Sequence, residues 1–295
     1  MPLTVTGTDL GFTGAGGLEL AATSYGDTDA AGVLLLHGFG QARGAWREVG
    51  RQLAEHGWHV ITLDLRGHGD SEWAPGYRFA DFEEDVRLVV AAAFRHPPAL
   101  IGASMGGILA LLTQADTRLA GAIGLIDVVP QFDLESGQRI QAFMATHRDG
   151  FPSLEAAADA VASHLEHRAR PDNPSGLLRN LRADETGWLR WKWDPRFADG
   201  LSWLADHPGD DLRAVADHVR GRMLTAAASL DVPTLLVRGR LSTFVSAQAA
   251  QAFADIVPYA ELVDVAHAGH MVAGDRNDVF ADAVVGFLQR HHPPR

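Results

Sequence analysis

A serine between two glycines is the residue of this 295-residue chain best suited to chemistry. Ser104 lies in a Gly-x-Ser-x-Gly pattern, after a short apolar run at 98–101 and before a helix-like run at 108–114. In a sharp turn between a strand and a helix, a serine hydroxyl projects above the sheet edge and can act as a nucleophile. Gly102 and Gly106 then occupy positions where a Cβ would collide with a neighbouring segment. The alternative is a plain glycine-rich turn, since the pattern also occurs by chance.

The composition narrows the classes of partner. Hydrophobic residues make up 46% and charged residues 21%, which is typical of an ordinary globular protein. A net charge of -12 argues against nucleic acid or an anionic membrane as the main partner. There is no cysteine, which excludes disulfides, thiolate metal sites and cysteine nucleophiles. No signal peptide or membrane-length apolar run is visible, so we expect a soluble, cytoplasmic protein.

The elements that must position Ser104 alternate between strand and helix. Continuous apolar runs predict buried strands at 32–36, 58–63, 98–101, 120–126, 233–237 and 260–265. Helical periodicity is found at 45–55, 79–93, 246–256 and 277–289. Two short strands, at 3–6 and 18–24, are predicted to form an antiparallel edge. The alternation predicts an α/β fold built on a mostly parallel sheet.

The alternation stops at Pro130 and resumes near residue 229. The intervening sequence is charged and rich in tryptophan, with no convincing strand and with candidate helices at 138–146, 153–166, 175–181 and 212–218. We therefore predict a sheet domain formed by 1–129 and 229–295, interrupted by a helical cap at 130–228.

Two further motifs support a family resemblance. His37-Gly-Phe39 follows an early strand and Ala268-Gly-His270 follows a late one, in the right order around the serine motif. With them the sequence resembles the α/β-hydrolase fold family over about residues 15–290. It is most similar to the capped branch, which holds esterases, epoxide-hydrolase-like proteins and cofactor-free haloperoxidases. The resemblance implies an eight-stranded type of sheet flanked by helices.

The resemblance also assigns catalytic roles. His270 corresponds to the base that takes the proton of Ser104 and returns it to the leaving group; the alternative is a surface-loop histidine. The backbone N–H groups of Phe39 and Met105 correspond to the oxyanion hole, which stabilises developing negative charge without reorganisation. No cofactor is implied, and no metal is expected because no metal-ligand spacing is present.

The acid is where this sequence departs from the family. Thr243 stands where an aspartate is expected, and residues 232–254 contain neither Asp nor Glu. A threonine offers no charge to stabilise the imidazolium. Three interpretations stay open: the acid has moved to Asp127, as in certain relatives; a Ser–His dyad works with water; or hydrolysis is not the function. A laboratory substitution of the usual aspartate by Thr243, made to trap a substrate, would give the same sequence.

Other side chains have two readings each. Trp191, Trp193 and Thr243 could line a substrate pocket, with the two tryptophans covering its apolar part. Alternatively, these tryptophans and Trp203 could pack the cap onto the sheet domain. His37 and His68 are expected to be structural.

The nucleophile ranks the reactions. Serine attack on an alkyl carbon would leave a stable ether, which disfavours epoxide hydrolysis and dehalogenation. We therefore predict a serine hydrolase that forms an acyl-enzyme with a small, mainly apolar acyl substrate: an ester, thioester or lactone. The alternative is a non-hydrolytic or ligand-binding protein of the same fold, such as a lyase or cyclase with a degenerate triad.

Overall fold

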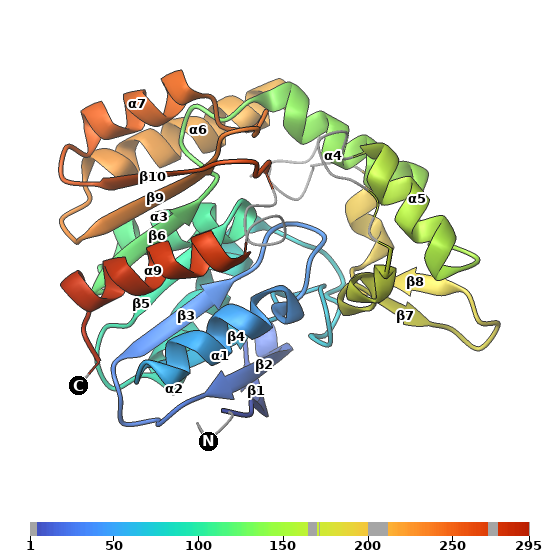
Figure 1. The fold of residues 1–295 in the computed structure, drawn as a ribbon, viewed down its shortest axis with the longest axis horizontal. Helices are drawn as coiled ribbons and strands as arrows, with labels where there is room; N and C mark the ends of the chain where they lie inside the picture. Colours follow the sequence, from blue (N-terminus) through green and yellow to red (C-terminus); the bar gives the residue numbers. More distant parts are fainter. Residues whose placement is uncertain (1–4, 165–169, 171, 200–211, 271–276, 295) are drawn as a thin grey trace.

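An eight-stranded sheet forms the middle of the molecule (Figure 1). The computed structural model describes residues 5–164, 170, 172–199, 212–270 and 277–294. The strand order is β1-β2-β4-β3-β5-β6-β9-β10. Strands β1, β2 and β4 are antiparallel neighbours, and all other neighbouring strands are parallel. The predicted α/β class and mostly parallel sheet are confirmed.

The apolar runs in the sequence form the buried strands. The strands are β1 Thr8–Thr13, β2 Glu19–Tyr25, β3 Gly32–Leu36, β4 His59–Leu63, β5 Ala99–Ala103, β6 Ala122–Ile126, β9 Thr234–Gly239 and β10 Glu261–Val265. Every residue of β3, β4 and β6 is buried, because helices cover both faces of a parallel sheet.

The first strand was predicted at the wrong place. Strand β1 begins at Thr8, whereas Val5 and Thr6 are not in a strand and residues 1–4 lie outside the described part. No residue of β1 is fully buried, since it lies at the sheet edge. An exposed edge strand carries no hydrophobic pattern by which the sequence could reveal it.

Helices cover the two faces of the sheet. They are α1 Arg47–Glu55, α2 Phe79–Ala93, α3 Met105–Thr117, α6 Leu212–Ala228, α7 Ala247–Ile256 and α9 Asn277–His291. The first and last pack on one face, and the other four on the opposite face. Helix α3 lies between the sheet, α2 and α6, so most of its residues are buried. Within the described residues, no helix is long and apolar enough to cross a membrane.

The elements between β6 and α6, here called the cap segment, extend to one side of the sheet (Figure 1). They are α4 Leu134–Thr146, α5 Leu154–His164, η3 Pro174–Arg179, β7 Leu181–Ala183, β8 Leu189–Trp191 and η4 Pro195–Asp199.

The prediction of no strand between 130 and 228 was wrong, because β7 and β8 form an antiparallel hairpin. Each has only three residues, with a single buried side chain, Leu181 or Leu189, which is too short a pattern to read. Helix α6 falls in the range predicted as cap, yet it packs on α3. Trp203 lies outside the described residues.

Candidate active site

Ser104 occupies a strained turn between β5 and α3. Its φ and ψ are 49° and -117°, a conformation that L-residues adopt rarely. A Cβ on Gly102 would lie 2.1 Å from the carbonyl carbon of Gly106, and a Cβ on Gly106 would lie 2.3 Å from the carbonyl oxygen of Leu36. The predicted steric need for both glycines is therefore confirmed, and the close approach of β3, β5 and α3 forces the turn.

The His37–Gly40 loop lies directly against this serine. A Cβ on Gly38 would be 3.4 Å from the Ser104 Cβ, so the loop passes the side chain within van der Waals distance. Phe39 follows in the same loop, half-buried. Met105 is the first residue of α3, where a backbone N–H has no partner within the helix. The two N–H groups expected to form an oxyanion hole thus belong to segments that flank Ser104.

Two buried histidines hold this loop. His37 Nδ1–H donates to the Gly38 carbonyl oxygen (2.8 Å), and its Nε2 accepts from the Leu65 N–H (3.0 Å). His68 Nε2 accepts from the Gly40 N–H (3.3 Å). Burial lowers the pKa of His37 to about 4 and the pKa of His68 to about 3. Both imidazoles are therefore neutral at pH 7, which fits the structural role expected for them.

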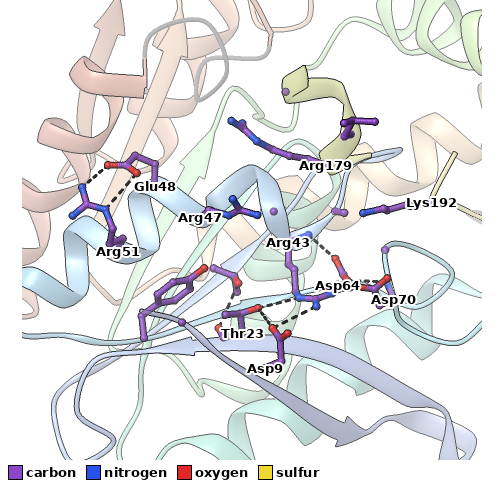
Figure 2. A pocket seen from close by; sticks show the side chains of 18 of the residues that line it. Asp9, Thr23, Arg43, Arg47, Glu48, Arg51, Asp64, Asp70, Arg179 and Lys192 are labelled. Atoms are coloured by element: carbon purple, nitrogen blue, oxygen red, sulfur yellow. Dashed lines mark hydrogen bonds and ion pairs between the residues drawn. The ribbon is translucent and has the colours of Figure 1, made fainter. Parts of the chain in front are cut away.

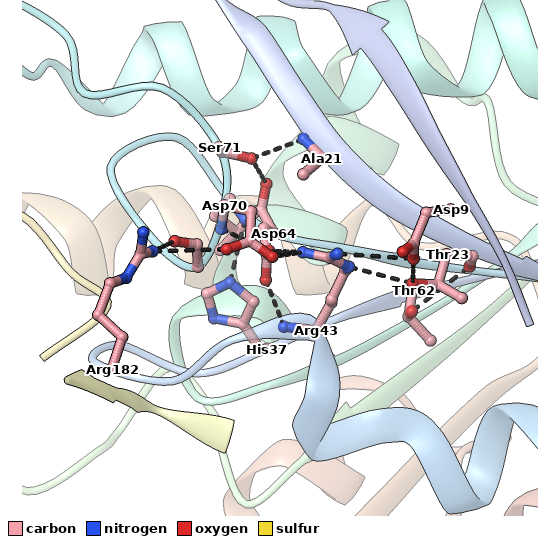
Figure 3. A network of polar contacts seen from close by, with 12 residues as sticks. Asp9, Ala21, Thr23, His37, Arg43, Thr62, Asp64, Asp70, Ser71 and Arg182 are labelled. Carbon is pink, nitrogen blue, oxygen red and sulfur yellow. Dashed lines mark hydrogen bonds and ion pairs between the residues drawn. The ribbon is translucent and has the colours of Figure 1, made fainter. Parts of the chain in front are cut away.

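Figure 3 shows a buried carboxylate, Asp64, that joins Arg43 to the loop at Asp70. Asp64 is fully buried and accepts the Arg43 N–H (2.5 Å), the Asp70 N–H (2.9 Å) and the Arg43 guanidinium. Burial raises the pKa of Asp64, while Arg43 acts in the opposite direction. A Cβ on Gly69 would lie 2.0 Å from the Asp64 carboxyl carbon, so glycine is required there. The segment Arg66-Gly-His-Gly-Asp-Ser71 thus forms a structural loop, and no sequence signal pointed to Arg43.

Asp127 meets His270. The imidazole Nδ1–H lies 2.7 Å from Asp127 Oδ2, although the two residues are 143 positions apart. Asp127 directly follows β6, has a φ of 50° and is fully buried, whereas the His270 side chain is 19% exposed. Among the described residues, the other ring nitrogen of His270 has no recorded hydrogen-bond partner. The ring itself packs on Phe244, with 4.5 Å between centroids.

The loop that lacks the expected acid holds this aspartate. The Gly239 N–H donates to Asp127 Oδ1 (3.1 Å), and the Ser242 hydroxyl donates to Oδ2 (2.5 Å). Ser242 Oγ also accepts from the N–H groups of Phe244 (3.1 Å) and Val245 (3.2 Å). Sequence reasoning missed Ser242; the available signal was a hydroxyl next to the position where the acid was absent.

Thr243 points toward the cap segment. Its Oγ1 and carbonyl oxygen each lie 3.0 Å from Ser136 Oγ on α4, and Arg139 donates to the same Ser136 oxygen (2.5 Å). The side chain is exposed. Its recorded polar contacts link the loop to the cap segment.

The predicted aromatic residues pack around the His37–Gly40 loop and within the cap segment. Trp193 is buried and stacks on Trp191 at 5.8 Å. A Cβ on Gly40 would lie 3.4 Å from Met144 Cε and 3.9 Å from Trp193 Nε1, so these side chains cover the loop. Trp191 instead donates to the His147 carbonyl oxygen (2.7 Å) inside the cap segment.

A sheet of this strand order, with a serine in a strained turn (the elbow) between β5 and α3, is typical of the α/β-hydrolase fold. Comparison with known proteins gives the same family. The model of the alpha/beta hydrolase family matches residues 33–283. This chain belongs to that family.

Curated relatives and solved structures are similar over most of their length. The chain is 27% identical over 280 residues to esterase Rv0045c of Mycobacterium tuberculosis (91% of this chain, 86% of the relative). It is 26% identical to the sn-1-specific diacylglycerol lipase ABHD11 of Mus musculus (89% and 82%). The crystal structure of E-2-(acetamidomethylene)succinate hydrolase superposes with a TM-score of 0.78 at 21% identity (96% and 100%), and shows the shared fold. The relatives support a hydrolase.

Proposed function

We propose that this chain is a serine hydrolase that cleaves carboxylic esters, or related thioesters and lactones, through an acyl-enzyme on Ser104. The observation that carries the proposal is the 2.7 Å contact between His270 Nδ1 and the buried carboxylate of Asp127. A buried carboxylate on one ring nitrogen selects the tautomer whose other nitrogen is a free base.

In the proposed reaction, His270 Nε2 takes the hydroxyl proton as Ser104 Oγ attacks the substrate carbonyl carbon. The carbonyl oxygen becomes an oxyanion, which accepts hydrogen bonds from the Phe39 and Met105 N–H groups. The imidazolium then gives its proton to the leaving alcohol or thiol, and the acyl group stays on Ser104. A water molecule, activated by the same histidine, hydrolyses the acyl-enzyme and restores the serine.

We assign the acid role to Asp127 rather than to the 243 position. Asp127 supplies the full negative charge that stabilises the imidazolium, and the N–H of Gly239 and the hydroxyl of Ser242 hold it in place. The Thr243 side chain contacts α4 instead. A carboxylate attached to β6 in place of β9 reaches the histidine because the two strands are parallel neighbours and end at the same sheet edge.

The side chains around the loop favour a small acyl substrate that is mainly apolar. Met144 and Trp193 lie over the loop beside Ser104, and Phe244 packs on His270. Phe39 and Met105 belong to the same hydrophobic cluster. Such a lining binds hydrocarbon and offers few partners for a charged acyl chain. The named relatives, an esterase and a diacylglycerol lipase, act on esters. We propose that Met144 and Trp193 of the cap segment form part of this lining, and that Trp191 supports it by stacking on Trp193.

A fluorophosphonate activity probe tests the proposal directly. We expect the probe to label the wild-type chain at Ser104, with no label in Ser104→Ala and a greatly reduced rate in His270→Ala. A matched control is Ser163→Ala, because this exposed serine of α5 donates to the Asp159 carbonyl oxygen of the same helix. Absence of labelling in a folded wild-type chain, checked by circular dichroism, would reject a serine hydrolase and favour the ligand-binding or non-hydrolytic alternative.

A further inference from the structure

A polar hollow of about 760 Å³ lies where the cap segment meets the sheet domain (Figure 2). Its walls come from β1 and β2, from residues 42–51, from the loop at 69–70, and from η3 and Lys192 of the cap segment. Ser104, Asp127 and His270 do not line it. The volume is in the range of pockets that bind small organic ligands.

The carboxylates of this hollow already have cationic partners. Arg43 pairs with Asp64 and with Asp70 (2.9 Å). Arg51 pairs with Glu48 (2.5 Å). The more exposed Asp9 is 3.6 Å from the Arg43 guanidinium. Most of the negative charge lining the hollow is thus held by Arg43 and Arg51.

Three further cations line the hollow without a carboxylate partner among the described residues: Arg47, Arg179 and Lys192. Arg47 comes from the start of α1, Arg179 from η3, and Lys192 from just after β8. Figure 2 shows their side chains entering the hollow from both sides. Lys192 is the only lysine in the sequence. Because the whole chain has a net charge of -12, this concentration of unpaired cations is a local feature.

We propose that this hollow binds a ligand that carries two or more phosphate groups. Two guanidinium groups offer planar, paired N–H donors that match phosphate oxygens, and the ammonium adds a compact charge. Several charges on the ligand are needed, because Asp9 and Asp70 remain near the rim and repel a weak anion. Since Arg47 belongs to the sheet domain and the other two cations to the cap segment, the bound ligand connects the two.

Lysine labelling tests this proposal without relying on hydrolase activity. Pyridoxal phosphate forms an imine with an amine, and borohydride reduces the imine to a stable secondary amine. We expect labelling at the Lys192 peptide, separable by mass spectrometry from the N-terminal amine, and we expect pyrophosphate to prevent it. Equal protection by pyrophosphate and ADP supports recognition of phosphate alone, and stronger protection by ADP supports an organic phosphate.

Substitutions show whether the named cations act together. Arg47→Gln and Arg179→Gln should each weaken protection by pyrophosphate roughly tenfold, since each removes a charged donor pair. Arg95→Gln, on an exposed arginine remote from the hollow, serves as the matched control and should leave protection unchanged. Circular dichroism and urea unfolding should match the wild type in all three variants, which shows that they fold. Equal protection by malonate, no protection by pyrophosphate, or identical behaviour of Arg47→Gln and Arg95→Gln would overturn the proposal.

Discussion

The Ser242 hydroxyl lies 2.5 Å from Asp127 Oδ2, the same oxygen that accepts the hydrogen bond from His270. Ser242 belongs to the loop after β9, whereas Asp127 directly follows β6. One carboxylate oxygen therefore joins two loops and the imidazole. The loop that lacks the expected acid still takes part in the site, by orienting an acid that comes from the neighbouring strand.

Removing the charge of Asp127 should nearly abolish turnover. In Asp127→Asn the amide cannot stabilise an imidazolium and favours the wrong imidazole tautomer, so we expect kcat to fall by about 10⁴-fold. Asp264→Asn, at a half-exposed aspartate paired with Arg238, is the control and should keep near wild-type kcat. Ester hydrolysis under saturating substrate measures both. A loss of less than tenfold in Asp127→Asn would favour the dyad interpretation.

Ser242 should act on kcat through the position of Asp127. In Ser242→Ala the carboxylate loses one donor and the Phe244 and Val245 N–H groups lose an acceptor. We expect kcat to fall roughly tenfold with little change in KM, and the free energy of unfolding to fall by about 1 kcal/mol. Ser242→Thr keeps the hydroxyl and should restore most of kcat. Equal loss in both variants would argue for a purely structural role.

Restoring an aspartate at the usual family position should not improve the enzyme. Thr243→Asp places a carboxylate next to Ser136 and Arg139 of α4, where Thr243 now makes its recorded polar contacts. We expect kcat to stay within about threefold of wild type, and the double variant Asp127→Asn/Thr243→Asp to remain inactive. Recovery of activity in the double variant would show that the usual acid position still reaches His270.

A methyl group at the elbow should destabilise the fold. In Gly106→Ala the new Cβ would lie 2.3 Å from the Leu36 carbonyl oxygen, on a strand that is fully buried. We expect the free energy of unfolding to fall by about 3 kcal/mol. Gly176→Ala is the matched control, since no heavy atom lies within 4 Å of its added Cβ. Urea unfolding compares them, and equal stability would contradict the close approach of α3 and β3.

Stability should fall as the pH is lowered from 6.5 toward 4. Burial lowers the pKa of His37 to about 4 and the pKa of His68 to about 3, from 6.5 in the unfolded chain. Between these values the unfolded state binds more protons, so protonation favours unfolding. The contribution of His37 is complete above pH 6.5, and about 3 kcal/mol is lost as the pH falls to 4. Urea unfolding at a series of pH values measures the slope.

A variant that lacks the His37 imidazole tests whether this residue causes the pH dependence of stability. In His37→Gln the slope between pH 6.5 and 4 should be smaller, because the glutamine cannot bind a proton in the unfolded state. His267→Gln, at an exposed loop histidine, should keep the wild-type slope. An unchanged slope in His37→Gln would show that other groups cause the acid sensitivity.

Features set by neighbouring residues could be read from the sequence. The Gly-x-Ser-x-Gly turn at Ser104 could be read from five consecutive residues, although the need for glycine at 106 comes from Leu36 on β3. The apolar runs of β3, β4 and β6 follow from burial on both faces of the sheet. The α/β fold class could be predicted from the alternation of apolar strand runs and helical segments along the chain. The edge strand β1 and the short hairpin of β7 and β8 bury too few side chains to leave such a pattern.

The partner of His270 could not be read in this way, because it depends on which strands are neighbours. The sequence left three interpretations open: Asp127 as the acid, a Ser–His dyad that works with water, and a function other than hydrolysis. The pairing of β6 with β9 brings Asp127 to the loop after β9, where Gly239 and Ser242 bind it and His270 lies 2.7 Å away. Contacts between residues more than a hundred positions apart carry no local signal, so only the tertiary structure decided which carboxylate the imidazole meets.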